Sequence, residues 1–344
     1  DGINCFYAGV TGCGWASGLW PHSWTVDFSA DGVSTYKYQV TGLRPTGPTL
    51  YTFCHENGHM LCYWPDLYDY DTGIDDSAGV GRFCLMCAGT SSTNPQEPCA
   101  YLKDISGWAS TTVMNTPHTE YTVPSNSNTI FKYEHPTLAN EYYLIENRQK
   151  VGRDAGLPDA GLAIWHIDTE GNNSDEDMTP ELHYLVTLVQ ADGDWDLEND
   201  VNVGDQTDLW SSPTHTDCTP LTDPNTNWWD GSASDLYVTN ISASSTSMTF
   251  LFSPMCDVAP QTLDFGLVAL GDSLDLTFTI YNLDASPLVG SASEICDHFI
   301  IASGENYNIP PGGTHDVTVR YKPSITGMHD CTIDTGSADC GEVY

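Results

Sequence analysis

The chain has 344 residues, which is long enough for two domains with buried cores. Its 10 basic and 47 acidic side chains give a formal charge of −37, so nucleic acid is excluded as a partner because its phosphates would be repelled. The sequence contains no run of about 20 apolar residues, which excludes a membrane-spanning helix.

Two strands and one helix are predicted in the first part of the chain. Residues 2–9 are apolar enough for a short buried strand, and residues 36–40 alternate as a half-buried strand does. Residues 49–61 form the best helix candidate, because Thr49 can cap its start and Pro65 prevents the helix from continuing much further.

The rest of the first domain alternates strand-like runs with loops. Residues 73–130 are rich in Gly, Ser, Thr and Asn and show few helical patterns. Apolar runs typical of strands follow at residues 141–146, 162–167, 183–190 and 247–252.

The composition changes at residues 253–256. Beyond this point, Gly and Pro turns separate short alternating segments at residues 274–281, 299–302, 315–321 and 331–334. This pattern is typical of a small β-sandwich, here of about 90 residues. We therefore expect two domains, residues 1–253 and residues 254–344.

The helix candidate carries the sequence His-Glu-x-x-His. His55 and His59 lie one turn apart, so they project from the same face and can occupy two corners of a zinc tetrahedron. Glu56 can polarise a zinc-bound water without being a ligand. The expected third ligand is Asp66, with Asp69 as the second choice. The alternative is that both aspartates cap the turn and that the two histidines are ordinary residues.

The run from His55 to Asp69 resembles the immune inhibitor A family of secreted bacterial zinc metallopeptidases. Five further segments match that family in the same order, so the resemblance covers about residues 2–253. These segments are residues 18–24, 84–89, 142–149, 161–168 and 190–198.

The resemblance implies a metzincin-like α+β metallopeptidase fold, with strands and loops around a zinc-binding helix. It implies that His55, His59 and Asp66 bind zinc and that Glu56 is the general base. Met86 would form a hydrophobic floor beneath the metal, a role that differs little from core packing.

The chain departs from the family pattern in two places. Cys62 occupies the position of a turn glycine, and one residue is inserted before Asp66. We expect a turn of different construction, clamped by a disulfide from Cys62, with Cys54 as a candidate partner. The family's catalytic domain also has substantial sequence before residue 2, so we expect this domain to lack its N-terminal part and its activity to depend on that part.

His22 lies between Trp20 and Trp24. It could point into the cleft and stabilise a tetrahedral oxyanion. We favour a structural role, in which the backbone satisfies the imidazole.

An acidic loop at residues 192–208 offers carboxylate oxygens at alternating positions, which suits the six to eight oxygen ligands of calcium. The EF-hand pattern is incomplete, and the alternative is a solvated loop. We favour calcium because crowded carboxylates repel one another without a cation. A weaker acidic cluster comprises Asp69, Asp71, Asp75 and Asp76. The expected calcium ligands are Asp192, Asp194, Asp196, Asp200, Asp205 and Asp208.

Twelve cysteines are many for a cytosolic protein, and outside the cytosol they predict disulfides. Cys84 and Cys87 form the only C-x-x-C pair, so a zinc ribbon is not expected. Together with the acid excess, the cysteines predict an oxidising, extracellular or cell-surface location. The disulfide candidates are Cys5, Cys13, Cys54, Cys62, Cys84, Cys87, Cys99, Cys218, Cys256, Cys296, Cys331 and Cys340.

Residues 256–323 resemble the hydin-type immunoglobulin-like domains of bacterial surface proteins. The four cysteines of this domain allow three pairings, and Cys331 with Cys340 could staple a terminal hairpin. No catalytic constellation occurs here, so we expect a role in spacing, adhesion or surface attachment. The chain ends within a strand pattern, which makes truncation of this sandwich one interpretation.

The favoured function is a secreted zinc endopeptidase that acts on protein or peptide substrates and also binds calcium. The alternative is an extracellular structural or adhesive protein on a protease-derived scaffold, in which open edge strands could join chains into filaments. A third hypothesis is a calcium-dependent binding module in which the acidic loop is the functional part.

Overall fold

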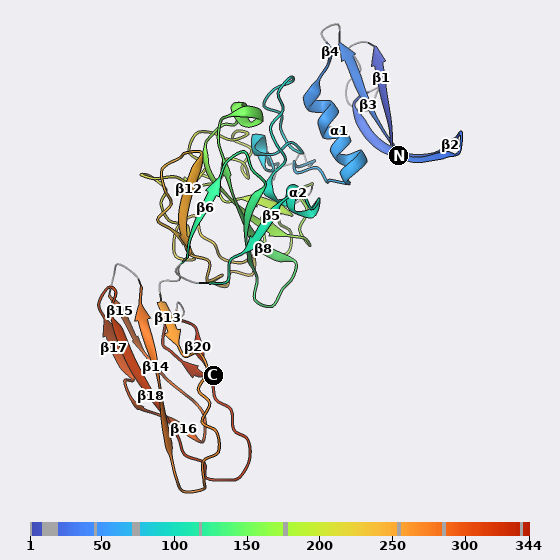
Figure 1. Cartoon of the computed structure of the whole chain (residues 1–344). Coiled ribbons are helices and arrows are strands. Elements are labelled where there is room, and N and C mark those ends of the chain that lie inside the picture. Colours follow the sequence, from blue (N-terminus) through green and yellow to red (C-terminus); the bar gives the residue numbers. More distant parts are fainter. Residues whose placement is uncertain are drawn as a thin grey trace. The chain divides into compact units, whose positions relative to one another are not determined.

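The computed structural model describes residues 2–8, 20–44, 47–70, 76–116, 119–174, 178–252, 256–283, 287–337 and 340–344. The described chain is mostly β-strand with few helices (Figure 1). It forms two compact units: unit 1 comprises Asp1–Ser234 and Val238–Leu251, and unit 2 comprises Asp235–Tyr237 and Phe252–Tyr344. No helix among the described residues is long and apolar enough to cross a membrane. The predicted roles of Cys13, Asp71 and Asp75 fall outside the described residues.

Unit 1 begins with a small sheet in the strand order β1-β3-β2. β1 (Gly2–Ala8) runs parallel to β3 (Val33–Arg44), while β2 (His22–Ala30) and β4 (Gly47–Pro48) run antiparallel to β3. β1 and β3 confirm strands at the positions predicted, residues 2–9 and 36–40, but no residue of β1 is buried, so the prediction of a buried strand there is wrong. β2 was not predicted, although Asp31-Gly32, both with positive φ, is the residue pair that two-residue hairpins favour.

The helix α1 (Leu50–Cys62) confirms the predicted helix and packs against this sheet (Figure 1). Phe53 stacks on Phe6 of β1 with 5.6 Å between the ring centroids. Thr49 is the N-cap residue, but its side chain makes no capping hydrogen bond. The first two N–H groups of the helix donate instead to the Ser92 carbonyl, so the start of α1 is held by a distant loop.

A five-stranded sheet in the order β10-β9-β8-β7-β5 forms the core of unit 1. Every residue of β8 (Glu141–Arg148) and β9 (Gly161–Asp168) is buried, as the apolar runs predict. The strand predicted at residues 183–190 is confirmed only at its centre, as β10 (Val186–Leu188). The remaining strands are β5 (Ser110–Val113) and β7 (Thr129–Glu134), and a second sheet orders β11 (Val238–Thr239), β12 (Ser247–Phe252) and β6 (Thr119–Pro124).

Short helical segments connect these sheets. They are α2 (Ala100–Ile105) and the 3-10 helices η1 (Gly81–Phe83) and η2 (Gly152–Gly156). α2 was not predicted, because six residues show less than two turns of a helical pattern and this stretch is rich in polar turn residues.

Unit 2 consists of a four-stranded sheet and two smaller sheets around one hydrophobic core. Phe278 and Ile280 alternate inward from one central strand and Val317 and Val319 from its neighbour, as predicted for residues 274–281 and 315–321. The large sheet orders β13 (Cys256–Ala259), β14 (Leu274–Asn282), β18 (Thr314–Tyr321) and β16 (Phe299–Ser303). The small sheets pair β15 (Leu288–Ser291) with β17 (Asn306–Ile309) and β19 (Ile333–Asp334) with β20 (Glu342–Val343).

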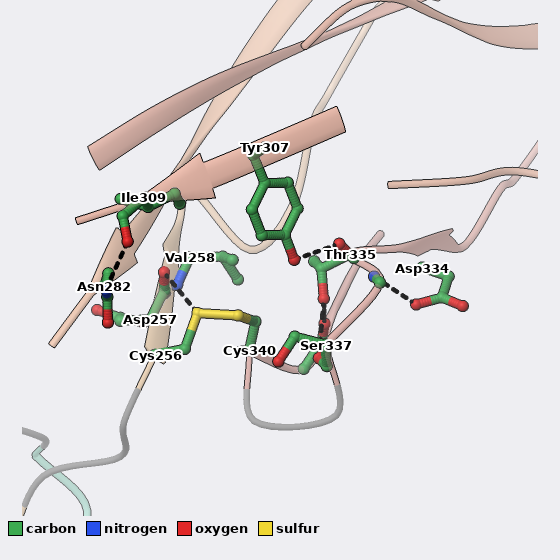
Figure 2. Close-up of a disulfide and its surroundings, with 12 residues drawn as sticks. Cys256, Asp257, Val258, Asn282, Tyr307, Ile309, Asp334, Thr335, Ser337 and Cys340 are labelled. Atoms are coloured by element: carbon green, nitrogen blue, oxygen red, sulfur yellow. Dashed lines mark hydrogen bonds between the residues drawn. A yellow bond between two sulfur atoms is a disulfide. The ribbon is translucent and has the colours of Figure 1, made fainter. Parts of the chain in front are cut away.

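Two disulfides close unit 2, and Figure 2 shows the one between Cys256 and Cys340. Cys256 bonds to Cys340 across 84 residues, and Cys296 bonds to Cys331 across 35. The suggested pair of Cys331 with Cys340 is therefore wrong. β19 pairs with β20 in a register that, if extended, places Gly336 rather than Cys331 opposite Cys340.

Unit 1 contains no disulfide among its described residues, which overturns the predicted pairing of its cysteines. The buried thiols pack instead as small apolar side chains in the core. The free cysteines are Cys5, Cys54, Cys62, Cys84, Cys87, Cys99 and Cys218.

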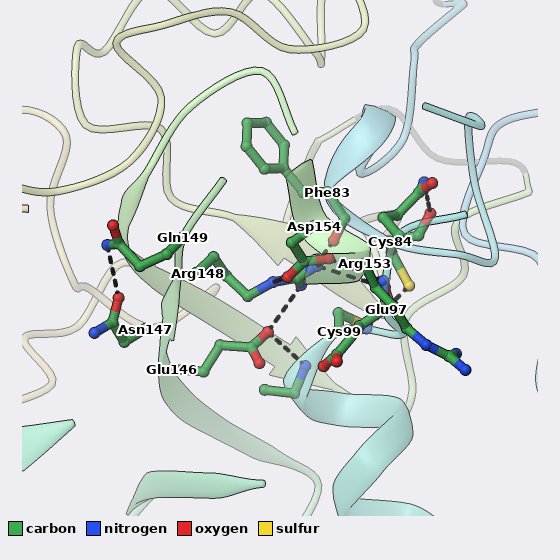
Figure 3. A network of polar contacts seen from close by, with 12 residues as sticks. Phe83, Cys84, Glu97, Cys99, Glu146, Asn147, Arg148, Gln149, Arg153 and Asp154 are labelled. Atoms are coloured by element: carbon green, nitrogen blue, oxygen red, sulfur yellow. Dashed lines mark hydrogen bonds and ion pairs between the residues drawn. The ribbon is translucent and has the colours of Figure 1, made fainter. Parts of the chain in front are cut away.

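A buried ionic network joins β8 to η1, η2 and α2 (Figure 3). The Arg148 guanidinium donates from Nε and Nη2 to the two carboxylate oxygens of Asp154, at 2.8 and 3.0 Å. Its Nη1 atom donates to the Phe83 carbonyl at 2.9 Å and to Glu146 Oε1 at 3.2 Å. The Lys103 ammonium of α2 lies 3.0 Å from Glu146 Oε2. Three short helical segments are thus tied to one strand.

Charge pairing decides the protonation states in this network. Burial alone would raise the pKa of Glu146 and of Asp154, but the neighbouring cations hold both pKa values below their usual range. Such carboxyl groups contribute stability that is fully present above the unfolded-state pKa of about 4. This contribution is lost as the pH falls through the lower folded-state pKa values, so acid weakens the network.

We predict that Asp154→Asn destabilises unit 1 by about 3–5 kcal/mol, because Arg148 then remains buried without its bidentate partner. Urea denaturation at pH 7 measures this loss. Glu134→Gln, at the more exposed pair with Lys132, is the matched control and should cost less than about 1 kcal/mol. The penalty of Asp154→Asn should shrink below about pH 4, where the wild-type carboxyl group becomes protonated first in the unfolded chain and, at lower pH, in the folded one. Equal costs for both variants would contradict this role.

Candidate metal centre

The two histidines of α1 face one another across one helical turn. Their Nε2 atoms lie 3.2 Å apart. His55 Nδ1 lies 3.2 Å from the Leu85 carbonyl oxygen, and His59 Nδ1 lies 2.6 Å from that of Trp64. A carbonyl oxygen only accepts hydrogen bonds, so each Nδ1 carries a proton, and in the neutral imidazole Nε2 then presents a lone pair. Both imidazoles are therefore in the tautomer that can bind a metal through Nε2.

The turn that follows α1 is built without glycine. Tyr63 adopts a left-handed φ of 59°, and its N–H donates to the His59 carbonyl at 3.2 Å. The predicted disulfide clamp between Cys54 and Cys62 is wrong, since both cysteines are free. They lie eight residues apart on one helix, about 12 Å along its axis, which exceeds the reach of a disulfide.

This turn brings Asp66 back to the histidines. Asp66 Oδ1 lies 3.0 Å from His55 Nε2 and 3.1 Å from His59 Nε2. Burial alone would raise the pKa of Asp66, but imidazoles that carry a proton on Nε2 would hold this pKa well below its usual range. Asp69, the other candidate, lies outside this group and accepts a hydrogen bond from the Ser77 N–H at 3.2 Å.

The three donor atoms fit a zinc ion. Tetrahedral zinc with bonds of about 2.0–2.1 Å places neighbouring ligand atoms about 3.3–3.4 Å apart. The measured separations are 3.0, 3.1 and 3.2 Å. Within the described residues, Asp66 Oδ1 is buried and makes no hydrogen bond of good geometry. Two nitrogen lone pairs and a carboxylate oxygen therefore converge on one point, an arrangement that a cation would relieve.

Glu56 lies beside the donor group and is 7 % exposed. Its burial raises the pKa of the carboxyl group, although the nearby His55 and His59 lower it. Its side chain is not one of the three converging donors, so it remains available for another role.

Met86 packs against α1 at Gly58. A Cβ built on Gly58 would lie 2.7 Å from Met86 Sδ and 2.8 Å from the Trp64 ring, so only glycine fits between the two histidines. The backbone around Met86 also holds the site, because its carbonyl accepts from the Leu67 N–H at 2.8 Å. The sequence motif did not identify Gly58 or the carbonyl of Leu85 as parts of the site, since both act through backbone geometry.

His22 has the contacts expected of a structural histidine. Its Nδ1 lies 2.9 Å from the Trp20 carbonyl oxygen and its Nε2 lies 3.0 Å from Tyr38 Oη. Both ring nitrogens therefore have partners, one on β3 and one in the segment just before β2.

Three of the six expected calcium ligands converge in the acidic loop. Asp192, Asp205 and Asp208 place carboxylate oxygens within 4.8 Å of one another. Thr207 Oγ1 donates to Asp192 Oδ2 at 2.5 Å and to Asp205 Oδ1 at 2.9 Å. Burial, and then the charges of Asp205 and Asp192, raise the pKa of Asp208 to about 7. The neighbouring carboxylates therefore disfavour a second and third negative charge in this group.

The other three aspartates do not join this group. Asp194 and Asp200 are exposed, and Asp196 Oδ2 accepts a hydrogen bond from Asn202 at 2.6 Å. Trp195 and Asp200 have positive φ, so the loop turns and alternate positions do not face the same side. Asp69 and Asp76, the described members of the weaker acidic cluster, form no such group either.

Comparison with known proteins places only the C-terminal part of the chain. Residues 254–342 match the family model described as HYDIN/CFA65/VesB-like, Ig-like domain, which confirms the hydin-type resemblance. No peptidase family was found for residues 1–253. Neither a curated protein nor a solved structure matches the chain.

We predict that zinc binding depends on Asp66 and not on Asp69. Asp66→Ala should weaken zinc binding at least about 100-fold, because removal of a direct ligand should cost no less than removal of a supporting residue. Competition with a chromophoric chelator, starting from metal-free protein, measures the affinity. Asp69→Ala is the matched control and should bind zinc as the wild type does. The assignment fails if Asp66→Ala keeps its affinity or if Asp69→Ala loses as much.

Proposed function

We propose that the protein is a secreted zinc-dependent endopeptidase that hydrolyses protein or peptide substrates. The observation that carries this proposal is the convergence of His55 Nε2, His59 Nε2 and Asp66 Oδ1 beside the buried Glu56. The resemblance of about residues 2–253 to the immune inhibitor A family supports the same function.

His55, His59 and Asp66 would hold the zinc ion. Three protein ligands leave a fourth position open, which is typical of catalytic rather than structural zinc. When bound, zinc would lower the pKa of a water molecule and polarise the scissile carbonyl group. The carbonyls of Leu85 and Trp64 would keep both imidazoles in the required orientation.

Glu56 would be the general base. It directly follows His55 on α1 and stays outside the donor group, so its carboxylate can accept a proton from the attacking water. The same carboxyl group would then pass the proton to the leaving amine nitrogen. Met86 would support the site from below through its contact with Gly58.

The Ig-like unit supports a second candidate, an extracellular structural or adhesive protein on a protease-derived scaffold. The observation that favours it is the match of residues 254–342 to an Ig-like domain model. The two disulfides of unit 2 fit an oxidising, extracellular or cell-surface location. In the endopeptidase proposal, the same unit would act as a spacer or a surface attachment for unit 1.

Glu56→Gln is predicted to keep zinc and lose hydrolysis. We expect cleavage of a fluorescent casein substrate to fall about 100- to 10,000-fold, the range of a general base, while the zinc content stays at one equivalent. Glu120→Gln, on the exposed surface of β6, is the matched control and should cleave as the wild type does. Full activity of Glu56→Gln would exclude this mechanism. A zinc-loaded wild type that cleaves nothing would instead favour the adhesive protein.

We also propose calcium at Asp192, Asp205 and Asp208, because a cation would relieve their mutual repulsion. Calcium at about 100 times its Kd should stabilise unit 1 by about 2.7 kcal/mol, which thermal unfolding of chelator-treated protein measures. Asp205→Asn should abolish this effect, and the exposed Asp200→Asn should preserve it. Calcium that stabilises all three proteins equally would show that it binds elsewhere.

A further inference from the structure

A cavity lies over the central five-stranded sheet of unit 1. Tyr143 on β8, His166 on β9 and Thr187 on β10 are paired directly across these three strands, so they lie in one row on one face of the sheet. All three line a cavity of about 680 Å3, a volume within the usual range of small-molecule sites. None of the residues around this cavity belongs to the metal centre or to the acidic group of Asp192, Asp205 and Asp208.

Three tryptophans line the cavity opposite or beside the row of sheet residues. The carboxylate of Glu141 connects one of these tryptophans, Trp229, to His166 of the sheet. The Trp229 ring stacks on the His166 ring with 5.2 Å between centroids and an interplanar angle of 10°. Trp228 lies 5.3 Å from the Tyr143 ring, and Trp195 also lines the cavity. Glu141 Oε1 lies 2.8 Å from His166 Nε2 and accepts from the Trp229 backbone N–H at 2.8 Å. The aromatic surface is therefore already arranged before a ligand arrives.

Three residues of the cavity each carry a buried polar atom that has no hydrogen-bond partner within the described chain. These atoms are Thr187 Oγ1, Asn227 Oδ1 and Trp229 Nε1. Thr187 is only 4 % exposed, so leaving its hydroxyl unpaired is unfavourable. Asn227 Oδ1 is an acceptor, Trp229 Nε1 is a donor, and the Thr187 hydroxyl can be either.

This set of polar groups suits hydroxyl groups better than ions. An ammonium ion donates only, and a quaternary ammonium ion does neither, so no cation can serve the Trp229 N–H. An anion would meet the net charge of −37 and the carboxyl groups of Asp76 and Glu198. Asn199 and Asn225 add neutral amides to the same lining, each with donors and an acceptor.

We propose that this cavity binds a neutral saccharide. The apolar C–H face of a sugar ring would lie against the tryptophan wall, and its hydroxyls would pair with Thr187, Asn227 and Trp229. The site is independent of the zinc endopeptidase function. The sugar could belong to a free oligosaccharide or to a glycan on another protein.

The test measures tryptophan fluorescence and saturation-transfer NMR of the full chain with a panel of free hexoses, N-acetylhexosamines and their disaccharides. A glycoprotein before and after removal of its glycans forms a second arm, which distinguishes the two sources of sugar. Choline chloride and a mixed octapeptide pool are the competing ligands. We expect saturable binding of at least one sugar probe and no binding of choline or peptides.

Three variants locate the site. Trp229→Phe keeps an aromatic face but removes the N–H, and Thr187→Val removes the hydroxyl at nearly constant volume; each should weaken sugar binding at least tenfold. Thr187→Val should not lower the melting temperature, because it removes an unpaired polar group. Trp24→Phe, which is 68 % exposed and outside the cavity, is the control and should bind as the wild type does. The proposal is overturned if no sugar binds, if choline or peptide binds instead, or if both cavity variants retain full affinity.

Discussion

The buried charge of Arg148 constrains much of unit 1. A guanidinium in the core is tolerated only with fully paired carboxylates, and here these come from η2 and from β8 itself. A further bond reaches the Phe83 carbonyl, two residues before Leu85. Because the Leu85 carbonyl orients the His55 imidazole, the core network and the candidate metal centre contact the same short piece of backbone. The ion pairs of Arg148 thus lie next to the backbone that positions His55, although they touch none of the three converging donors.

The excess of acidic over basic residues helps to explain why two groups of carboxylates in the described part of unit 1 lack a lysine or arginine partner. The chain has 10 basic residues for 47 acidic ones, and Lys103 and Arg148 are already committed to the core network. Carboxylates elsewhere must be compensated by hydrogen bonds, by protons or by ions from solution. The group of Asp192, Asp205 and Asp208 and the group around Asp66 are places where hydrogen bonds do not suffice. Cations are thus proposed as part of the folded state of unit 1.

The sequence predicted the helices and strands that have a clear local pattern of apolar residues. α1 and the buried strands β8 and β9 followed from periodicity and apolar runs, and the spacing of His55 and His59 on one helix face followed from helix geometry. The sequence favoured Asp66 over Asp69 as third ligand, but it could not show how the chain returns to the histidines, because that depends on the left-handed turn at Tyr63. The disulfide partners and the cavity over β8, β9 and β10 could not be predicted because residues far apart in sequence meet there only after folding.

The distribution of cysteines means that two processes compete in time during maturation: oxidation of cysteines to disulfides, and folding that encloses the thiols of unit 1. Unit 2 needs an oxidant to join Cys256 to Cys340, whereas unit 1 keeps Cys84, Cys87 and Cys99 as buried thiols. Disulfide formation takes seconds to hours, so the earlier part of the chain must enclose its thiols before the oxidant reaches them. A mutation that merely slows the collapse of unit 1 would then lower the yield of correct protein through wrong cross-links, even if the finished fold were equally stable.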